Sequence, residues 1–274
     1  MTVSKLILGV SLLFGGAVSF TQTAHSAEKT CTGTDTSVLT AGDYCYVEPT
    51  YYGITVYEMG LCVGAPTAPT TTSAMDTSNC VVAFSNPAGS LVSVENGSTS
   101  TPSGTFSRPA DGAYTHAYMR LNNTFLIKAS VNFGAGHASG IAQFCTSNTG
   151  TGDNENGGVA AACAGAAGTP GLTTTELTDF SGASSNNTSS ATVGSLTVYL
   201  LDSTQNMTIA AEMNQLGASG IFGVQAFATP VVISSSTTAL DAAITVSQGS
   251  TISLNAGPAV TVDSGPFSLT LSVN

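Results

Sequence analysis

Alternation of apolar and polar residues with a period of two dominates this chain. Across 124–133 the odd-numbered positions are apolar and most even-numbered positions are polar, which is the pattern of a strand with one buried and one solvated face. Positions 113–121 alternate in the same way. Because Asn122-Asn123 between them can adopt the positive φ of a tight turn, the pattern predicts a β-hairpin over 113–133.

Further short strands are predicted along the rest of the chain, and turn-forming residues separate those of the tail at Gln248-Gly249, 255–258 and Ser264-Gly265. The predicted strands cover residues 52–61, 80–84, 91–94, 195–202, 240–246, 251–254, 259–262 and 266–273. Closely spaced strands with turn signals are typical of an antiparallel arrangement. We therefore predict an all-β fold, either an antiparallel β-sandwich or a meander.

One segment fits two readings. Ile209, Met213 and Leu216 recur at helical spacing between positions 208 and 217, which predicts a short helix. The same residues are also compatible with a strand that runs on from Asn206, so both alternatives stay open.

The segment 146–194 interrupts the alternation, because it is rich in Thr, Gly, Asn, Ala and Ser. A long structureless loop is unusual inside a compact domain. We therefore predict a disulfide-containing β-domain over 28–165, a linker or surface insertion over 166–190 and a C-terminal β-domain over 191–274. The alternative is one sandwich in which both sets of strands interleave.

Residues 1–27 have the features of a secretory signal peptide. Lys5 supplies a positive charge, 6–20 is mostly apolar, and Ala24-His25-Ser26 resembles a small-x-small cleavage site. The apolar run is shorter than the about 20 residues that a membrane span needs, which disfavours an uncleaved anchor. No later segment reaches that length, so we expect a secreted protein, extracellular or on the cell surface, with no transmembrane segment in the mature chain.

All the cysteines follow this leader, and their even number suits three disulfides in an oxidising compartment. Fifteen pairings are possible, and sequential pairing is favoured because it closes three loops of similar, short length. A cysteine metal site is not predicted, since the chain has no C-x-x-C pair and no histidine at ligand spacing. The cysteines are Cys31, Cys45, Cys62, Cys80, Cys145 and Cys163.

Charge narrows the choice of partners. The chain has 16 acidic and 5 basic residues, a formal net charge of −11, and 42% hydrophobic residues. So few cations cannot neutralise phosphates, which excludes nucleic acid as a partner. The hydrophobic content is too high for an intrinsically disordered chain.

Catalytic residues are not evident. The two histidines beyond the leader are His116, on an alternating strand with Arg120, and His137, in a Gly-rich turn. The acids are scattered, and no G-x-S-x-G, S-x-x-K or H-E-x-x-H motif occurs. We predict that the protein is not an enzyme, with no catalytic residue and no cofactor.

The sequence contains two further groups of residues that resemble binding sites. The run 153–157 offers clustered oxygen ligands for calcium, but the EF-hand glutamate at the twelfth position is replaced by Ala164, so no metal site is predicted. The absence of Trp disfavours a sugar cleft, although Tyr51, Tyr52 and Tyr57 are able to stack on sugars.

The tail offers the best clue to function. Residues 229–274 contain no Lys or Arg, and their only acids are Asp241 and Asp263. Edge strands of soluble proteins are usually guarded by charges, above all by Lys. We therefore predict a structural protein that self-associates through strand edges into a homopolymer, as a filament, pilus-like fibre, sheath or surface layer. The alternative is a secreted adhesin or glycan-binding module on a β-sandwich.

Overall fold

The computed structural model describes residues 28–32, 39–95, 98–153, 158–178, 186–191, 194–209, 217–255 and 258–273. Strands make up 57% of the chain and the described residues form no helix, which confirms the all-β prediction. The predicted leader and positions 210–216 lie outside the described residues. No helix in the described ranges is long and apolar enough to cross a membrane.

The strands are, in chain order, β1 (Tyr44–Val47), β2 (Tyr51–Cys62), β3 (Cys80–Glu95), β4 (Ser98–Thr99), β5 (Thr105–Phe106), β6 (Gly112–Lys128), β7 (Ser130–Asn132), β8 (Phe144–Thr146), β9 (Gly150–Asp153), β10 (Val159–Ala160), β11 (Ala162–Ala164), β12 (Thr173–Glu176), β13 (Asn186–Ala191), β14 (Gly194–Leu201), β15 (Gly220–Ile233), β16 (Leu240–Thr245), β17 (Ser250–Leu254), β18 (Val260–Ser264) and β19 (Ser268–Val273).

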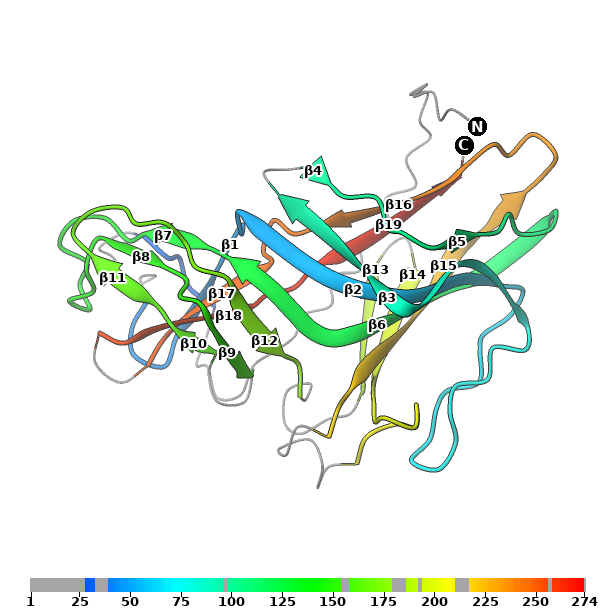
Figure 1. Ribbon diagram of the computed structural model, residues 1–274, viewed down its shortest axis with the longest axis horizontal. Coiled ribbons are helices and arrows are strands. Elements are labelled where there is room, and N and C mark those ends of the chain that lie inside the picture. Colours follow the sequence, from blue (N-terminus) through cyan, green and yellow to red (C-terminus); the bar gives the residue numbers. More distant parts are fainter. Residues whose placement is uncertain are drawn as a thin grey trace.

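These strands form one large sheet and three smaller ones. The ten-stranded sheet has the order β13-β14-β15-β6-β2-β3-β4, with β12 paired to β6 and β9, and β5 paired to β3. The others are the four-stranded sheet β1-β17-β18-β10, the three-stranded sheet β11-β8-β7 and the pair β16-β19. The long strands β2 and β6 curve through the molecule and connect its two ends (Figure 1).

The main hydrophobic core lies where one half of β2 and β6 meets β17 and β18. Tyr52, Phe125 and Phe267 form an aromatic triangle with ring centroids 5.9–6.0 Å apart. Ile252 and Leu254 of β17 belong to the same buried cluster. Alternating apolar residues thus bury one face of each sheet against the other, as in a sandwich.

The hairpin predicted over 113–133 is wrong, because β6 is one continuous strand. Neither Asn122 nor Asn123 has a positive φ. They lie where β6 changes neighbours: its first part pairs with β15 and its last part with β12. The buried Asn123 amide donates to the carbonyls of Leu177 (3.2 Å) and Ala218 (3.1 Å). A side chain thus satisfies carbonyl groups at the change of partner, where local sequence alone suggested a turn.

The prediction of a linker or surface insertion over 166–190 also needs correction. Strand β12 lies within this segment and pairs with β6 and β9. Strands from both predicted domains share sheets, since β1 pairs with β17 and β6 pairs with β15. The proposed boundaries therefore do not separate the sheets, and the interleaved alternative describes the arrangement. The segment 166–190 is polar and rich in small side chains, and it nevertheless contains a short strand whose partners lie far away in the chain.

Three disulfides join Cys31 to Cys45, Cys62 to Cys80 and Cys145 to Cys163. This is the sequential pairing that similar loop lengths favoured. The second and third bonds each join residues directly opposite one another, in β2–β3 and β8–β11. Closing loops of this size typically adds about 3 kcal/mol of stability. The three bonds are consistent with an extracellular location.

Candidate functional site

The two histidines singled out in the sequence occupy unrelated environments. His116 is half-buried on β6, where its Nδ1 lies 2.8 Å from the Thr115 hydroxyl. His137 is buried in a turn, where Ser139 N–H donates to its Nδ1 (3.2 Å) and its ring meets Phe133 edge-on. Burial lowers the pKa of both rings. Each therefore favours the neutral imidazole.

Glu58, Asp111 and Asp263 have different partners. Glu58 accepts a hydrogen bond from the Tyr118 hydroxyl (2.7 Å), and Asp111 pairs with Arg108 (2.6 Å). Asp263 is buried in β18, and this burial raises its pKa to about 7, although Ser264 N–H donates to it (2.6 Å). Asp153 also raises the pKa of Asp263 by charge repulsion.

The predicted calcium-ligand run is described only at Asp153, because 154–157 lie outside the described residues. Within the described ranges, no three His, Cys, Asp or Glu residues gather as metal ligands would.

An apolar cavity of about 280 Å³ lies on the inner face of the large sheet, and Phe267 of the aromatic triangle forms part of its lining. Its floor is built from rows of residues that lie directly opposite one another across β2, β6, β15 and β14 and therefore share a face. One row comprises Met59, Met119, Gly223 and Val198, and the next comprises Leu61, Ala117, Gln225 and Leu196.

Two small residues explain why this floor is hollow. Gly223 and Ala117 occupy the centre of the two rows, where larger side chains stand on either side. The three atoms nearest to a Cβ built on Gly223 would belong to Val198 at 3.6 Å, Leu196 at 3.8 Å and a backbone oxygen at 4.0 Å. A methyl group at position 223 would therefore fit without a close contact.

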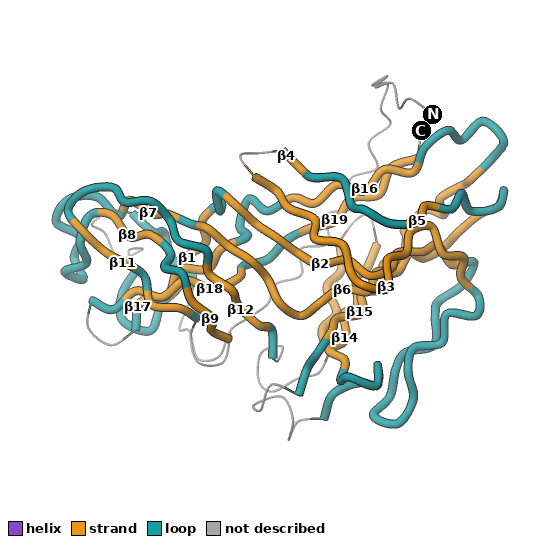
Figure 2. The backbone as a smooth tube through the Cα atoms, viewed as in Figure 1, coloured by secondary structure: helices purple, strands orange, loops and turns teal. Residues whose placement is uncertain are grey.

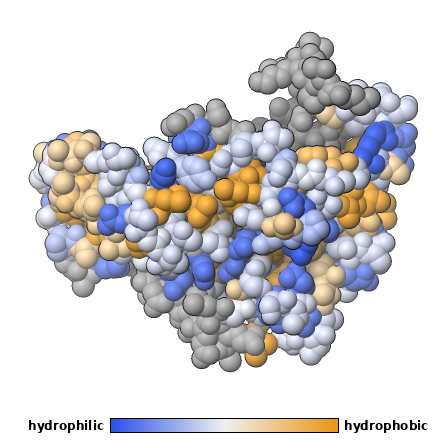
Figure 3. All heavy atoms as spheres, viewed as in Figure 1, coloured by the Kyte–Doolittle hydropathy of each residue, from blue (hydrophilic) through white to orange (hydrophobic). Residues whose placement is uncertain are grey.

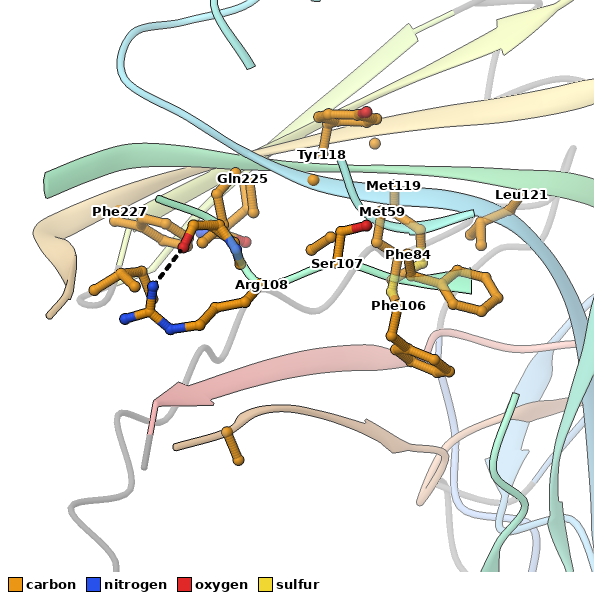
Figure 4. A pocket seen from close by; sticks show the side chains of 18 of the residues that line it. Met59, Phe84, Phe106, Ser107, Arg108, Tyr118, Met119, Leu121, Gln225 and Phe227 are labelled. Atoms are coloured by element: carbon orange, nitrogen blue, oxygen red, sulfur yellow. Dashed lines mark hydrogen bonds between the residues drawn. The ribbon is translucent and has the colours of Figure 1, made fainter. Parts of the chain in front are cut away.

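Strands β3 and β5 border one side of the cavity, and loops border the other. Phe84 and Phe106 pack together on one side with ring centroids 5.0 Å apart. On the other side Arg108 binds Asp111 and also donates to the Ser234 carbonyl (2.5 Å), which ties the loop after β5 to the loop after β15. Figure 4 shows Phe106, Met59 and Met119 at one side of this space and Arg108 with Phe227 at the other. No sequence motif marks this cavity.

The pair β16–β19 is the second candidate surface. Leu240 lies opposite Val273, Ala242 opposite Leu271 and Ile244 opposite Leu269. Among the described residues, neither strand pairs with any other strand. Figure 2 shows the pair as a separate ribbon. Ile244 and Phe267 pack against the main core, so the molecule holds this ribbon in place while both outer backbone edges stay unpaired within the described chain.

The outer face of β2 is the third candidate surface. Tyr51 and Tyr57 are half-buried there, with Lys128 Nζ 5.6 Å from one ring centroid and Arg120 Cζ 5.3 Å from the other. Tyr52, the remaining tyrosine considered for stacking, is buried in the core. The face shown in Figure 3 is mostly weakly polar, with hydrophobic patches between the polar side chains.

Neither a protein family model, nor a curated protein, nor a solved structure matches this chain. The candidate sites are therefore interpreted from their geometry alone.

Proposed function

We propose that the protein is a non-enzymatic structural subunit of an extracellular assembly, joined to its neighbours through the edges of the β16–β19 ribbon. The observation that carries this proposal is that, among the described residues, β16 and β19 pair only with each other. An unpaired edge offers backbone N–H and C=O groups to a strand of another chain. A homopolymer forms when the β16 edge of one copy pairs with the β19 edge of the next, because such head-to-tail contacts need not close.

Charge supports the same proposal. Asp241 is the only charged residue within β16 and β19, and neither strand contains Lys or Arg. Edge strands that must avoid association usually carry such charges, or are short, bulged or covered. The leader-like residues 1–27 and the three disulfides support an exported, oxidised subunit.

Electron microscopy of the exported, purified protein tests the proposal. We expect fibres or sheets in negative stain, and large species in sedimentation velocity. Thr245 is exposed at the end of β16, so Thr245→Lys adds a guarding charge to the edge strand with little effect on folding. We expect this variant to sediment mainly as monomers.

Thr71→Lys is the matched control, because Thr71 is exposed in a loop outside every strand and the change in net charge is identical. This control should assemble like the original protein. The proposal fails if the original protein stays monomeric at every concentration, or if Thr245→Lys assembles as well as Thr71→Lys.

A second candidate function, glycan binding, is favoured by one observation. Tyr51 and Tyr57 place two rings on the outer face of β2, each beside a cation, and aromatic faces are a common support for sugar rings. A glycan array tests this candidate. Binding should be lost in Tyr57→Ala and kept in Tyr44→Ala, because Tyr44 belongs to the separate sheet of β1. The absence of any bound glycan would contradict it.

A further inference from the structure

The cavity on the inner face has the construction of a ligand site. We propose that it binds an uncharged, apolar small molecule, either a hydrocarbon chain or a compact aromatic compound. This inference does not rest on the proposed assembly. It rests on the volume of the cavity, on the residues of its floor and on the charge around its mouth.

The hollow arises in the middle of well-formed strands. β15 pairs regularly with β14 over eight consecutive positions that include Gly223, so no bulge in that pairing explains a glycine there. Glycine weakens a strand interior and often marks a place where another molecule approaches the backbone closely. Its φ is not in the left-handed region, so the backbone conformation does not require glycine either. Neither a bulge nor the backbone conformation thus explains the glycine at position 223. What glycine does provide there is space for another molecule.

The lining is apolar over most of its extent. Buried side chains of Leu61, Met119, Leu121 and Ile221 form much of the floor. The polar amide of Gln225 donates to the Ala226 carbonyl (3.1 Å). Transfer of apolar surface from water to such a lining is favourable by roughly 25 cal/mol per Å², and this transfer supplies the affinity that we propose.

Charge selects a neutral ligand. Arg108 is the only charged residue among the described ones that line the cavity. Its guanidinium is engaged with Asp111, the Ser234 carbonyl and the Pro109 carbonyl. An anionic ligand would therefore lose its hydration and would find no cation that is not already paired. Burial of such an unpaired ion is costly.

The volume sets the size of the ligand. A dry apolar cavity of about 150 Å³ is sufficient for benzene or xenon. The cavity here measures about 280 Å³, which scales to about eleven carbon atoms by that comparison. This volume is just below that of typical small-molecule pockets, which begin near 300 Å³.

Fluorescence titration with N-phenyl-1-naphthylamine tests the proposal, because this probe is uncharged, apolar and bright in a dry site. We expect saturable binding of one probe per chain. Competition by 1-decanol should be at least about tenfold stronger than competition by decanoate at pH 8, since only the latter carries a charge into the site. Equal competition by the two compounds would overturn the assignment of a neutral ligand.

Two leucine variants locate the probe. Gly223→Leu fills the cavity and should weaken probe binding at least about tenfold, the equivalent of 1.4 kcal/mol. Gly112→Leu is the matched control, because a Cβ at Gly112 meets nothing within 4 Å and Gly112 does not line the cavity. This control should bind like the original protein.

A third variant keeps the test valid if Gly223→Leu does not fold. The Cβ of Gly223→Ala fits without close contact, so this variant should fold and bind the probe less tightly than the original protein. The proposal is overturned if the original protein shows no saturable binding, or if folded Gly223→Ala and Gly223→Leu bind the probe as tightly as the original protein.

Discussion

The inner face of β2 and β6 differs between its two halves. In the packed half, Tyr52, Ile54 and Phe125 are at most 1% exposed and press against β17 and β18. In the hollow half, Ala117 and Gly223 line a cavity of about 280 Å³ that also touches β5 and the residues just before β16 and β19. The same two long strands thus contribute to a filled core and to an open one.

The difference shows what alternation does and does not determine. A period of two decides which side chains point to the inner face in both halves. Whether that face is filled depends on the volumes of the residues and on the layer above them. The packed half has a sheet above it, whereas the hollow half is bordered by β5, by the loop after it and by the residues just before β16 and β19.

Truncation in the packed half should have the largest effect. Phe125→Ala removes a ring that is fully buried and should lower the free energy of unfolding by about 3–5 kcal/mol. Met119 borders the existing cavity, so its side chain has fewer contacts to lose. Met119→Ala should therefore lower the free energy of unfolding by less than about 2 kcal/mol. Urea denaturation measures both changes, and equal costs would remove the distinction between the two halves.

A charge placed beneath the ribbon should be the next largest perturbation. Ile244 is partly buried against the core, whereas its neighbour Thr245 is exposed. Ile244→Asp should therefore cost about 2–4 kcal/mol, as expected for an unpaired charge in an apolar contact. Thr245→Asp should cost less than about 0.5 kcal/mol. Thermal unfolding compares the two variants, and similar melting temperatures would mean that the ribbon does not pack on the core.

Stability should depend on pH through Asp263, which lies in the packed half. Burial raises its pKa from 3.8 to about 7, so between these values the folded chain holds a proton that the unfolded chain has released. The contribution of this group to stability is therefore present at low pH and is lost as pH rises towards 7, at up to about 1.4 kcal/mol per pH unit. Asp263→Asn should remove this slope, and an unchanged difference between pH 4 and 7 would contradict it.

The smallest expected effect has the opposite sign. Gly223→Ala should stabilise the hollow half by about 0.5–1 kcal/mol, because glycine is costly in a strand interior and the added methyl group fits. Chemical denaturation measures the gain. A loss of stability would show that the space above Gly223 is already occupied by neighbouring side chains.

Sequence reasoning succeeds where the signal is local. The tail strands over 240–273 and the pairing of cysteines at similar spacings follow from alternation, turn residues and loop length, and the structure contains both. It fails at Asn122-Asn123, where a turn signal coincides with a change of strand partner. The partners β12 and β15 lie about 50 and 100 residues further along the chain, so no local pattern identifies them.

The cavity illustrates the same limit. Gly223 is one of 30 glycines, and its sequence neighbourhood does not distinguish it. Its role becomes visible only when the register places it beside Met119 and Val198. The linker prediction over 166–190 fails for a similar reason. The polar composition of β12 does not reveal that this strand pairs with β6.

Diffraction from a crystal pressurised with xenon tests most directly whether only one half of the inner face is hollow. Xenon binds dry apolar cavities without needing any polar partner. We expect a xenon peak above Gly223, between Met119 and Phe227, and none beside Phe125. A cavity without xenon, or a comparable peak within the packed half, would contradict the distinction between the two halves and the ligand site derived from it.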